Sequence, residues 1–166
     1  MNHNIHLEAV KGDGYSLGYI IDQTEDLCLA AVKEDEWALQ FVKNQTEELC
    51  LVAVRQSGHT LEHVKTQTER VCIEAVQRDG AAIQYVKNQT EDLCLVAVKQ
   101  SGNTIKYIKN QTEAICLEAV KQNGVSFKYV KNQTEAICLG AAKKNSRTIR
   151  SIKDPVLREK IRGMDL

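Results

Sequence analysis

The sequence is poor in proline and in the bulky aromatic residues that usually fill a globular core. Its 166 residues include one Pro, two Phe and one Trp, although 43% are hydrophobic. It also lacks an apolar run of about 18 residues, so we expect no transmembrane helix. The first residues, MNHNIH, lack the basic start and apolar stretch of a signal peptide. We therefore expect a cytoplasmic protein whose core is built from small aliphatic side chains.

The net charge is zero, but the two signs are unevenly distributed along the chain. Residues 1–83 contain 7 Lys or Arg and 14 Asp or Glu, a net charge of −7, whereas residues 84–166 contain 15 and 8, a net charge of +7. In an elongated fold this distribution forms a dipole along the chain, which affects the partners that each half attracts. Opposite charge at the two ends also permits weak head-to-tail self-association.

Cysteine reveals an internal repeat of 22 residues. Six cysteines recur at this spacing: Cys28, Cys50, Cys72, Cys94, Cys116 and Cys138. The triplet Gln-Thr-Glu recurs with the same period, beginning at residues 23, 45, 67, 89, 111 and 133. Self-similarity at a fixed period is typical of stacked repeat arrays. We predict one repeat domain over 1–166, with a partial unit at 1–22, six repeats at 23–153 and a C-terminal cap helix at 154–166.

Each repeat has the signals of a helix followed by a shorter helix. In residues 45–66, Thr46 is a good N-cap, and the acidic residues after it favour the start of a helix. Cys50 and Val54 then fall on one helical face. Gly58 is expected to end this helix as a left-handed cap, as are its equivalents in other repeats. A second helix or 3₁₀ turn of about six residues follows.

The segment Leu-Cys-Leu-Val-Ala-Val could also form a buried strand, as in leucine-rich repeats. The Thr-Glu-Glu and Arg-Gln-Ser-Gly sequences on its two sides are helix start and stop signals, and they favour the helix. We therefore predict an all-α fold, a right-handed α-solenoid of about seven helix-turn-helix repeats. Asp154 and Pro155 supply an N-cap and first helical position for a terminal helix.

The repeat unit Leu-Cys-Leu-x-Ala-Val-Lys-x-x-Gly-x-x-Ile-x-Tyr-Val-Lys-Asn-Gln-Thr-Glu resembles an uncharacterised helical repeat family of bacteria, phages and giant viruses. That family is known only as a domain of unknown function. The resemblance covers nearly the whole chain and implies a helical array without an assigned catalytic activity. Glu36, which replaces the glycine of the unit, and the Arg-rich C-terminal end depart from the family pattern.

We call the set of equivalent positions in successive repeats a column. Several columns contain residue types that could act in catalysis or bind a metal, but each also has a structural interpretation. Stacked cysteines about 9–10 Å apart are too distant for disulfides, and we interpret them as core thiols. His59 and His63 match the H-x-x-E-H motif of some zinc peptidases, but no third ligand is evident. The repeated Lys and Glu columns are expected to neutralise each other on the surface. We predict no catalytic residue, no metal site and no cofactor, and hence no enzyme.

The variable positions of the repeat predict a binding surface. One column changes in every repeat, and the column three residues later changes with it, so the two should form one ridge. We assign partner binding to ten residues of this ridge: Tyr15, Trp37, Gln40, His59, Glu62, Asn103, Lys106, Lys128, Arg147 and Arg150. Its N-terminal end is aromatic and its C-terminal end is basic. Tyr, Trp and Arg are frequent anchors of protein interfaces.

Our leading interpretation of function is a non-enzymatic module that binds a partner protein along this ridge. A first alternative is an inhibitor of a bacterial defence complex encoded by a phage or mobile element, which protection of a phage in a plaque assay would distinguish. A second alternative is nucleic-acid binding through the basic C-terminal segment, which would weaken steeply with salt. We expect no interaction with a membrane.

Overall fold

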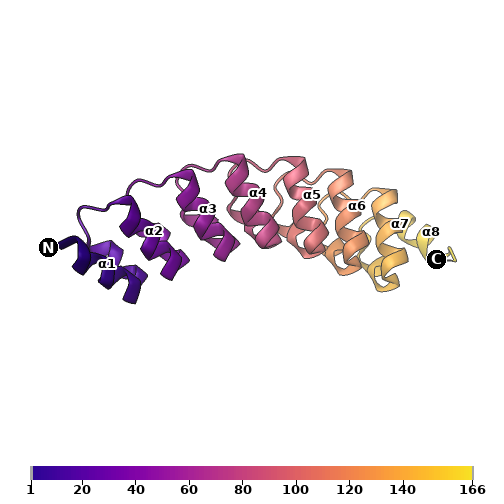
Figure 1. Ribbon diagram of the computed structural model, residues 1–166. Coiled ribbons are helices and arrows are strands. Elements are labelled where there is room, and N and C mark those ends of the chain that lie inside the picture. Colours follow the sequence, from indigo (N-terminus) through magenta and orange to yellow (C-terminus); the bar gives the residue numbers. More distant parts are fainter. Residues whose placement is uncertain (1, 166) are drawn as a thin grey trace. The chain divides into compact units, whose positions relative to one another are not determined.

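The computed structural model describes residues 2–165, and paired α- and 3₁₀-helices make up most of them (Figure 1). The N-terminal unit, residues 1–87, contains α1 (Asn2–Gly12), η1 (Gly14–Tyr19), α2 (Glu25–Glu34), η2 (Glu36–Phe41), α3 (Glu47–Gln56), η3 (Gly58–His63), α4 (Glu69–Arg78) and η4 (Gly80–Tyr85). The C-terminal unit, residues 88–166, contains α5 (Glu91–Gln100), η5 (Gly102–Tyr107), α6 (Glu113–Gln122), η6 (Gly124–Tyr129), α7 (Glu135–Lys144), η7 (Ser146–Ser151) and α8 (Pro155–Arg162). The predicted all-α repeat fold is confirmed, and no strand occurs between residues 2 and 165.

Local hydrogen bonds set the bounds of both helices in a repeat. The Thr46 hydroxyl accepts a hydrogen bond from the Leu49 N–H at 3.3 Å, which confirms the predicted N-cap of α3. The helix ends where the Ser57 N–H donates to the Ala53 carbonyl, and η3 begins at the next residue. Other 3₁₀ helices start from a side-chain cap, as when Asp79 accepts from the Ala81 N–H at 2.8 Å.

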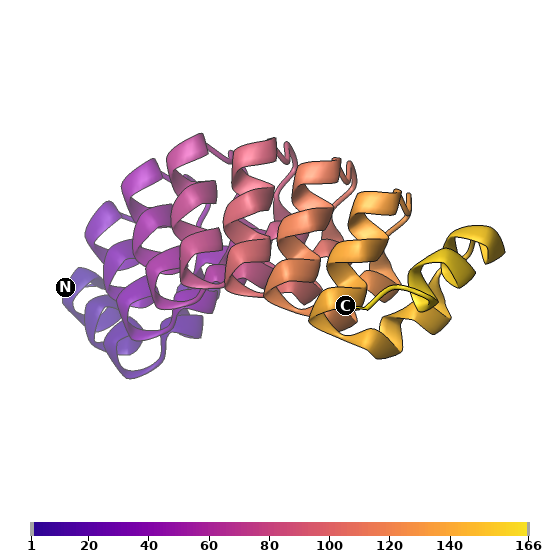
Figure 2. The same cartoon turned by 90° about the vertical axis from the view of Figure 1, so that its right-hand side faces the viewer.

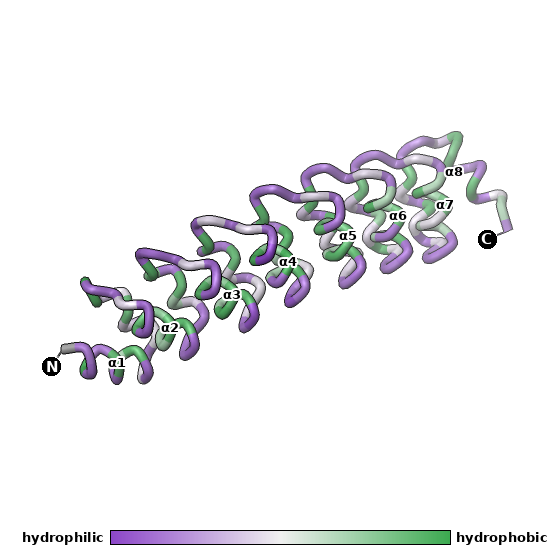
Figure 3. Tube along the Cα trace, turned by 45° about the horizontal axis from the view of Figure 1, so that its top comes forward, coloured by the Kyte–Doolittle hydropathy of each residue, from purple (hydrophilic) through white to green (hydrophobic). Residues whose placement is uncertain are grey.

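Within each unit the α-helices form one layer and the 3₁₀ helices a second layer against it (Figures 1 and 2). The apolar stretches lie where these helices face one another, and the polar stretches lie in the turns (Figure 3). In α3 and η3, the side chains of Ala53, Val54 and Leu61 are completely buried. Each repeat therefore completes the hydrophobic core of its neighbour. A single repeat has no complete core of its own and is not expected to fold alone. Between residues 2 and 165, no helix combines the length and the apolarity needed to cross a bilayer.

The glycine that begins most 3₁₀ helices does not act as the predicted left-handed cap. No described residue, glycine included, has a positive φ. A Cβ placed on Gly58 would instead lie 2.4 Å from the Ala75 carbonyl oxygen of the next repeat. On Gly102 it would lie 2.3 Å from the Ala119 carbonyl oxygen. At Gly58 and Gly102 the glycine therefore permits the close approach of neighbouring backbones and does not serve an unusual backbone conformation.

A glutamine in each turn links one repeat to the next. The Gln45 amide donates to the carbonyls of Leu39 and His63, at 3.1 and 2.9 Å, and its oxygen accepts from the Lys65 N–H at 2.9 Å. Gln23 and Gln111 make the equivalent three bonds. Glutamine therefore bonds the turns of successive repeats, whereas the neighbouring Asn44 is exposed.

The Lys and Glu columns do not neutralise each other as predicted, because both bond the adjacent repeat. The Lys65 ammonium donates to the carbonyls of Val42 and Lys43, at 2.8 and 2.9 Å. Glu47 accepts a hydrogen bond from the Thr68 hydroxyl at 2.5 Å. No ion pair joins the Lys column to the Glu column within residues 2–165.

The last repeat is covered by α8 and not by another helix pair. Asp154 accepts from the N–H groups of Val156 and Leu157, and Pro155 occupies the first turn, as the sequence predicts. Ile161 is completely buried, and the Lys160 ammonium pairs with Glu135 of α7 at 2.6 Å. This helix therefore closes the core of the C-terminal unit.

Candidate partner-binding surface

In the N-terminal unit, the first variable column lies on the 3₁₀ layer and is only partly exposed. Tyr15 is 41% exposed, whereas Trp37 and His59 are half-buried. Each of these rings packs edge-on against an aromatic ring of the next repeat. The pairs are Tyr15 with Phe41, Trp37 with His63 and His59 with Tyr85, with centroid distances of 5.4, 5.5 and 5.7 Å. Such pairs stabilise by about 0.5–1.5 kcal/mol beyond area burial.

The sequence interpretation missed the second partner in these contacts. The predicted ridge omits the aromatic column at Tyr19, Phe41, His63 and Tyr85, although three of these rings contact ridge residues. The two members of each ring pair are separated by 26 residues, one repeat plus four. A search for aromatic residues at that spacing could have found the pairs. The variable positions are thus constrained by the neighbouring repeat, and the fold does not leave them wholly free.

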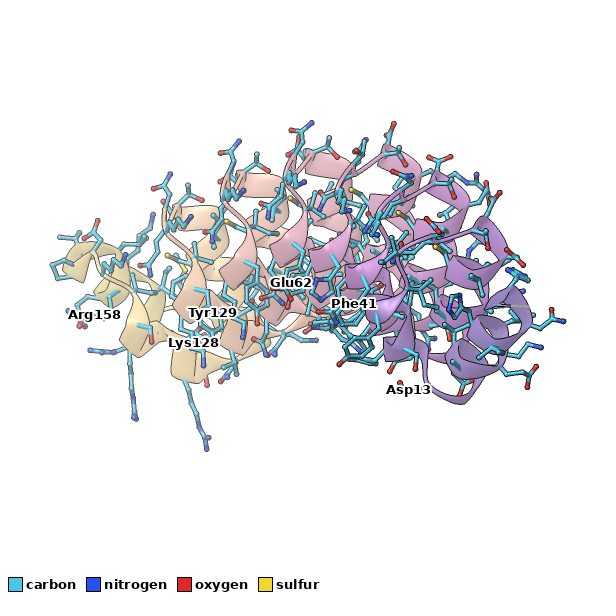
Figure 4. All side chains as sticks on the ribbon, turned by 90° about the vertical axis from the view of Figure 1, so that its left-hand side faces the viewer. Asp13, Phe41, Glu62, Lys128, Tyr129 and Arg158 are labelled. Carbon is cyan, nitrogen blue, oxygen red and sulfur yellow. The ribbon has the colours of Figure 1, made fainter. Side chains whose placement is uncertain are left out.

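The second variable column is the more exposed of the two. Gln40 and Glu62 are exposed in the N-terminal unit, and the Gln40 amide donates to the Trp37 carbonyl three residues before it at 3.1 Å. In a 3₁₀ helix, residues three apart lie directly above each other. The structure thus brings together the two columns within each repeat, as the ridge prediction requires. Phe41 and Glu62 are labelled on this layer in Figure 4.

In the C-terminal unit the second variable column is entirely basic, and the first column adds Arg147. Lys106, Lys128, Arg147 and Arg150 are all exposed, and Asn103 is half-buried. The ammonium groups of Lys106 and Lys128 lie 4.6 and 4.8 Å from the ring centroids of Tyr107 and Tyr129. This places a cation over each ring face, and the contact with Tyr107 raises the pKa of Lys106. Lys128 and Tyr129 are labelled in Figure 4.

The two histidines of the H-x-x-E-H motif point to different neighbours. His59 Nδ1 lies 3.1 Å from a carboxylate oxygen of Asp79 in the following repeat. His63 packs against Trp37 of the preceding repeat. The two imidazoles are therefore held apart by separate contacts. Among residues 2–165, no group of three or more His, Cys, Asp or Glu residues is placed to hold a metal ion.

A pocket of about 490 Å³ opens at the first two turns of the N-terminal unit, next to Cys28 and Lys43. Burial raises the pKa of the Cys28 thiol, which disfavours the reactive thiolate. The Lys43 ammonium donates to the Ile21 carbonyl at 2.7 Å. The pocket is therefore lined by a thiol with a raised pKa and by a lysine that is already bonded to a backbone carbonyl.

The cysteine column is buried, in agreement with its interpretation as core thiols. All six cysteines are free and buried, and burial raises the pKa of the Cys94 thiol to about 11. We expect a thiol reagent such as Ellman's reagent to leave the folded protein unmodified at pH 8 and to modify all six cysteines after unfolding in guanidinium. Rapid modification of the folded protein would contradict this burial.

The raised pKa also predicts a loss of stability in alkali. The folded state holds the Cys94 proton more tightly than the unfolded state, whose thiol has the ordinary pKa of 9.0. The stability contributed by the neutral thiol is present below pH 9 and is lost as the pH rises from 9 towards 11. Thermal unfolding between pH 8 and 10.5 measures this effect. A Cys94→Ala variant should show a smaller fall in Tm over that range.

Comparison with known proteins supports the repeat but assigns no activity. The family described as Domain of unknown function (DUF4116) matches residues 90–134. That segment runs from the N-cap Thr90 to the N-cap Thr134, and so spans two consecutive repeats. The match fits the resemblance to an uncharacterised helical repeat family. No curated protein and no solved structure matches the chain.

Proposed function

We propose that the chain is a non-enzymatic module that binds a partner protein through the 3₁₀ layers of its two units. The observation that carries this proposal is the contrast between columns. The buried columns keep nearly the same residue in every repeat, as with alanine at 31, 53, 75, 97, 119 and 141. The variable columns present aromatic, acidic and basic side chains on the 3₁₀ layers of the two units.

The composition of that layer supports protein binding. The N-terminal unit offers Tyr15, Trp37 and His59 with their ring partners, and such residues form the buried anchors of many interfaces. The C-terminal unit offers exposed Arg147 and Arg150. Because most of these rings are already held by a neighbouring ring, little conformational entropy would be lost on binding.

Affinity capture from the native cell, followed by mass spectrometry, tests the proposal. A variant combining Trp37→Ala, Arg147→Ala and Arg150→Ala is expected to lose the captured partner, with recovery at least about tenfold lower. A matched control replaces three exposed lysines of the α-layers, Lys33, Lys99 and Lys121, with alanine. An unchanged partner list for the first variant, with both proteins folded by circular dichroism, would reject the assignment.

Nucleic-acid binding through the C-terminal unit is a second candidate, favoured by its charge. Residues 88–166 contain 14 Lys or Arg and 8 Asp or Glu, a net charge of +6, whereas residues 1–87 contain 8 and 14, a net charge of −6. Two of the basic groups, Lys160 and Arg162, are paired with Glu135 and Glu159. A gel shift with a short duplex at 50 and 200 mM salt tests this candidate, because phosphate contacts weaken steeply over about that range.

Light scattering at the same two salt concentrations tests head-to-tail self-association.

A further inference from the structure

The signs of charge are separated between the 3₁₀ layers of the two units. In the four 3₁₀ helices of the N-terminal unit and the residues that cap them, the Asp and Glu residues are Asp13, Asp35, Glu36, Glu62 and Asp79. These four segments contain no Lys or Arg. The three equivalent segments of the C-terminal unit, residues 101–107, 123–129 and 145–151, contain Lys106, Lys128, Arg147 and Arg150 and no acidic residue.

The capping residues show that the fold does not require this separation. Asp35 accepts a hydrogen bond from the Trp37 N–H at 2.8 Å, and Asn145 accepts the equivalent bond from the Arg147 N–H at 3.1 Å. Asn and Asp are about equally good caps. Asn therefore keeps the hydrogen bond and removes a negative charge from beside the basic residues. The cap positions of the C-terminal unit hold Ser101, Asn123 and Asn145, although the fold would also accept Asp there.

The basic side chains of the C-terminal unit form a row across neighbouring repeats. Lys106, Lys128 and Arg150 occupy the same position in η5, η6 and η7, and these three 3₁₀ helices pack side by side. None of the ion pairs found between residues 2 and 165 includes any of the three. The row is thus a set of exposed cations held at the spacing of the repeat, with Lys128 visible beside Tyr129 in Figure 4.

We propose that this row, Lys106, Lys128 and Arg150, binds an extended acidic segment of a partner protein, with one carboxylate to each repeat. Packed helices lie about 8–10 Å apart. A polyproline II segment has three residues per turn and rises about 3.1 Å per residue, so acidic residues three apart in sequence lie on one face of it, about 9 Å apart. An acidic residue at every third position would therefore place one carboxylate opposite each cation. This inference rests on the proposed function and specifies the partner of the C-terminal unit.

The ring contacts favour an acidic peptide over a single-stranded nucleic acid. Nucleic acids without sequence preference bind by stacking bases on exposed aromatic faces, in addition to phosphate contacts. The rings of Tyr107 and Tyr129 are half-buried, and the ammonium groups of Lys106 and Lys128 lie over them. The covered faces are poor platforms for bases. The cations above them remain available to carboxylates.

The test is a fluorescence anisotropy titration of the full chain at low salt with a labelled 12-residue peptide, four repeats of Glu-Gly-Ser. Changing Lys106, Lys128 and Arg150 to Gln is expected to weaken binding at least about tenfold. The matched control changes Lys99, Lys121 and Lys143 to Gln, which removes the same charge from exposed positions on the α-layer of the same unit. The control is expected to bind within about twofold of the parent protein, because its lysines lie outside the row.

Two further probes decide between the occupants. A peptide of the same composition with its four Glu residues contiguous is expected to bind more weakly than the spaced peptide, and equal binding would overturn the inference. Equal or tighter binding of a 12-residue oligo-dT would overturn it in favour of nucleic acid. Failure of the spaced peptide to bind, while the Trp37, Arg147 and Arg150 variant still loses its captured partner, would overturn this inference and leave the proposed function standing.

Discussion

Gly58→Ala is expected to lower the free energy of unfolding of the N-terminal unit by about 3 kcal/mol, the upper end of the usual cost of overpacking. The added Cβ would lie 2.4 Å from the Ala75 carbonyl oxygen and 3.2 Å from the Asp79 Cβ. The nearest atom belongs to the backbone, so no side-chain rotation relieves the contact, and the two repeats must separate. Trp37, the only tryptophan of the chain, lies in the same unit and reports its unfolding in urea by fluorescence.

Gly12→Ala is the control for this prediction. Gly12 ends α1 in the same unit, and a Cβ there would meet no atom within 4 Å. Alanine is the better helix former, so this variant should unfold at the same urea concentration as the parent protein or slightly higher. Glu36 holds the equivalent position in residues 23–44, so the packing at that junction of repeats accommodates a Cβ. Equal stability of Gly58→Ala and Gly12→Ala would show that the junction between residues 45–66 and 67–88 adapts just as readily.

Gln45→Ala is also expected to lower the free energy of unfolding of the N-terminal unit by about 3 kcal/mol. The substitution removes three hydrogen bonds that link two successive repeats. Their backbone partners are the carbonyls of Leu39 and His63 and the N–H of Lys65. Each net contribution is about 0.5–1.5 kcal/mol, and the cost rises where a backbone group is left buried without a partner. The same urea titration, followed through Trp37, measures the loss.

Asn44→Ala and Gln45→Glu are the comparison variants for the stability loss expected of Gln45→Ala. Asn44 is the exposed neighbour of Gln45, and its loss should change stability by less than about 0.5 kcal/mol. A carboxylate at 45 keeps the acceptor for the Lys65 N–H but has no N–H for the two carbonyls, so we expect it to be at least as destabilising as alanine at pH 7. A Gln45→Ala protein as stable as Asn44→Ala would mean that water replaces the amide at little cost.

The periodicity predicted most of the fold because six copies of the repeat carry the same helix start and stop signals. Thr46 and its equivalents gave the helix starts, and an α-helix of ten residues followed by a 3₁₀ helix of six matches the prediction closely. The errors concern contacts with the next repeat. Within a single repeat, the position of Gly58 after a helix predicts a left-handed cap. The spacing of the Lys and Glu columns likewise predicts ion pairs between them. In both cases the actual contacts are with the adjacent repeat. The same limit hid the ring pairs, such as Trp37 with His63, whose members lie in different repeats.

The sequence by itself determined the helix pairs, their caps, the buried cysteine column and the opposite charge of the two halves. These properties follow from side-chain chemistry and spacing within a single repeat. Only the tertiary structure decided what the glycines, the lysines and the variable aromatic residues contact, because those partners lie about one repeat away. The tertiary structure likewise determined that the side chains of Lys106, Lys128 and Arg150 are exposed. A linear pattern specifies which faces are apolar, but the stacking of one repeat on the next determines which side chains remain accessible to a partner.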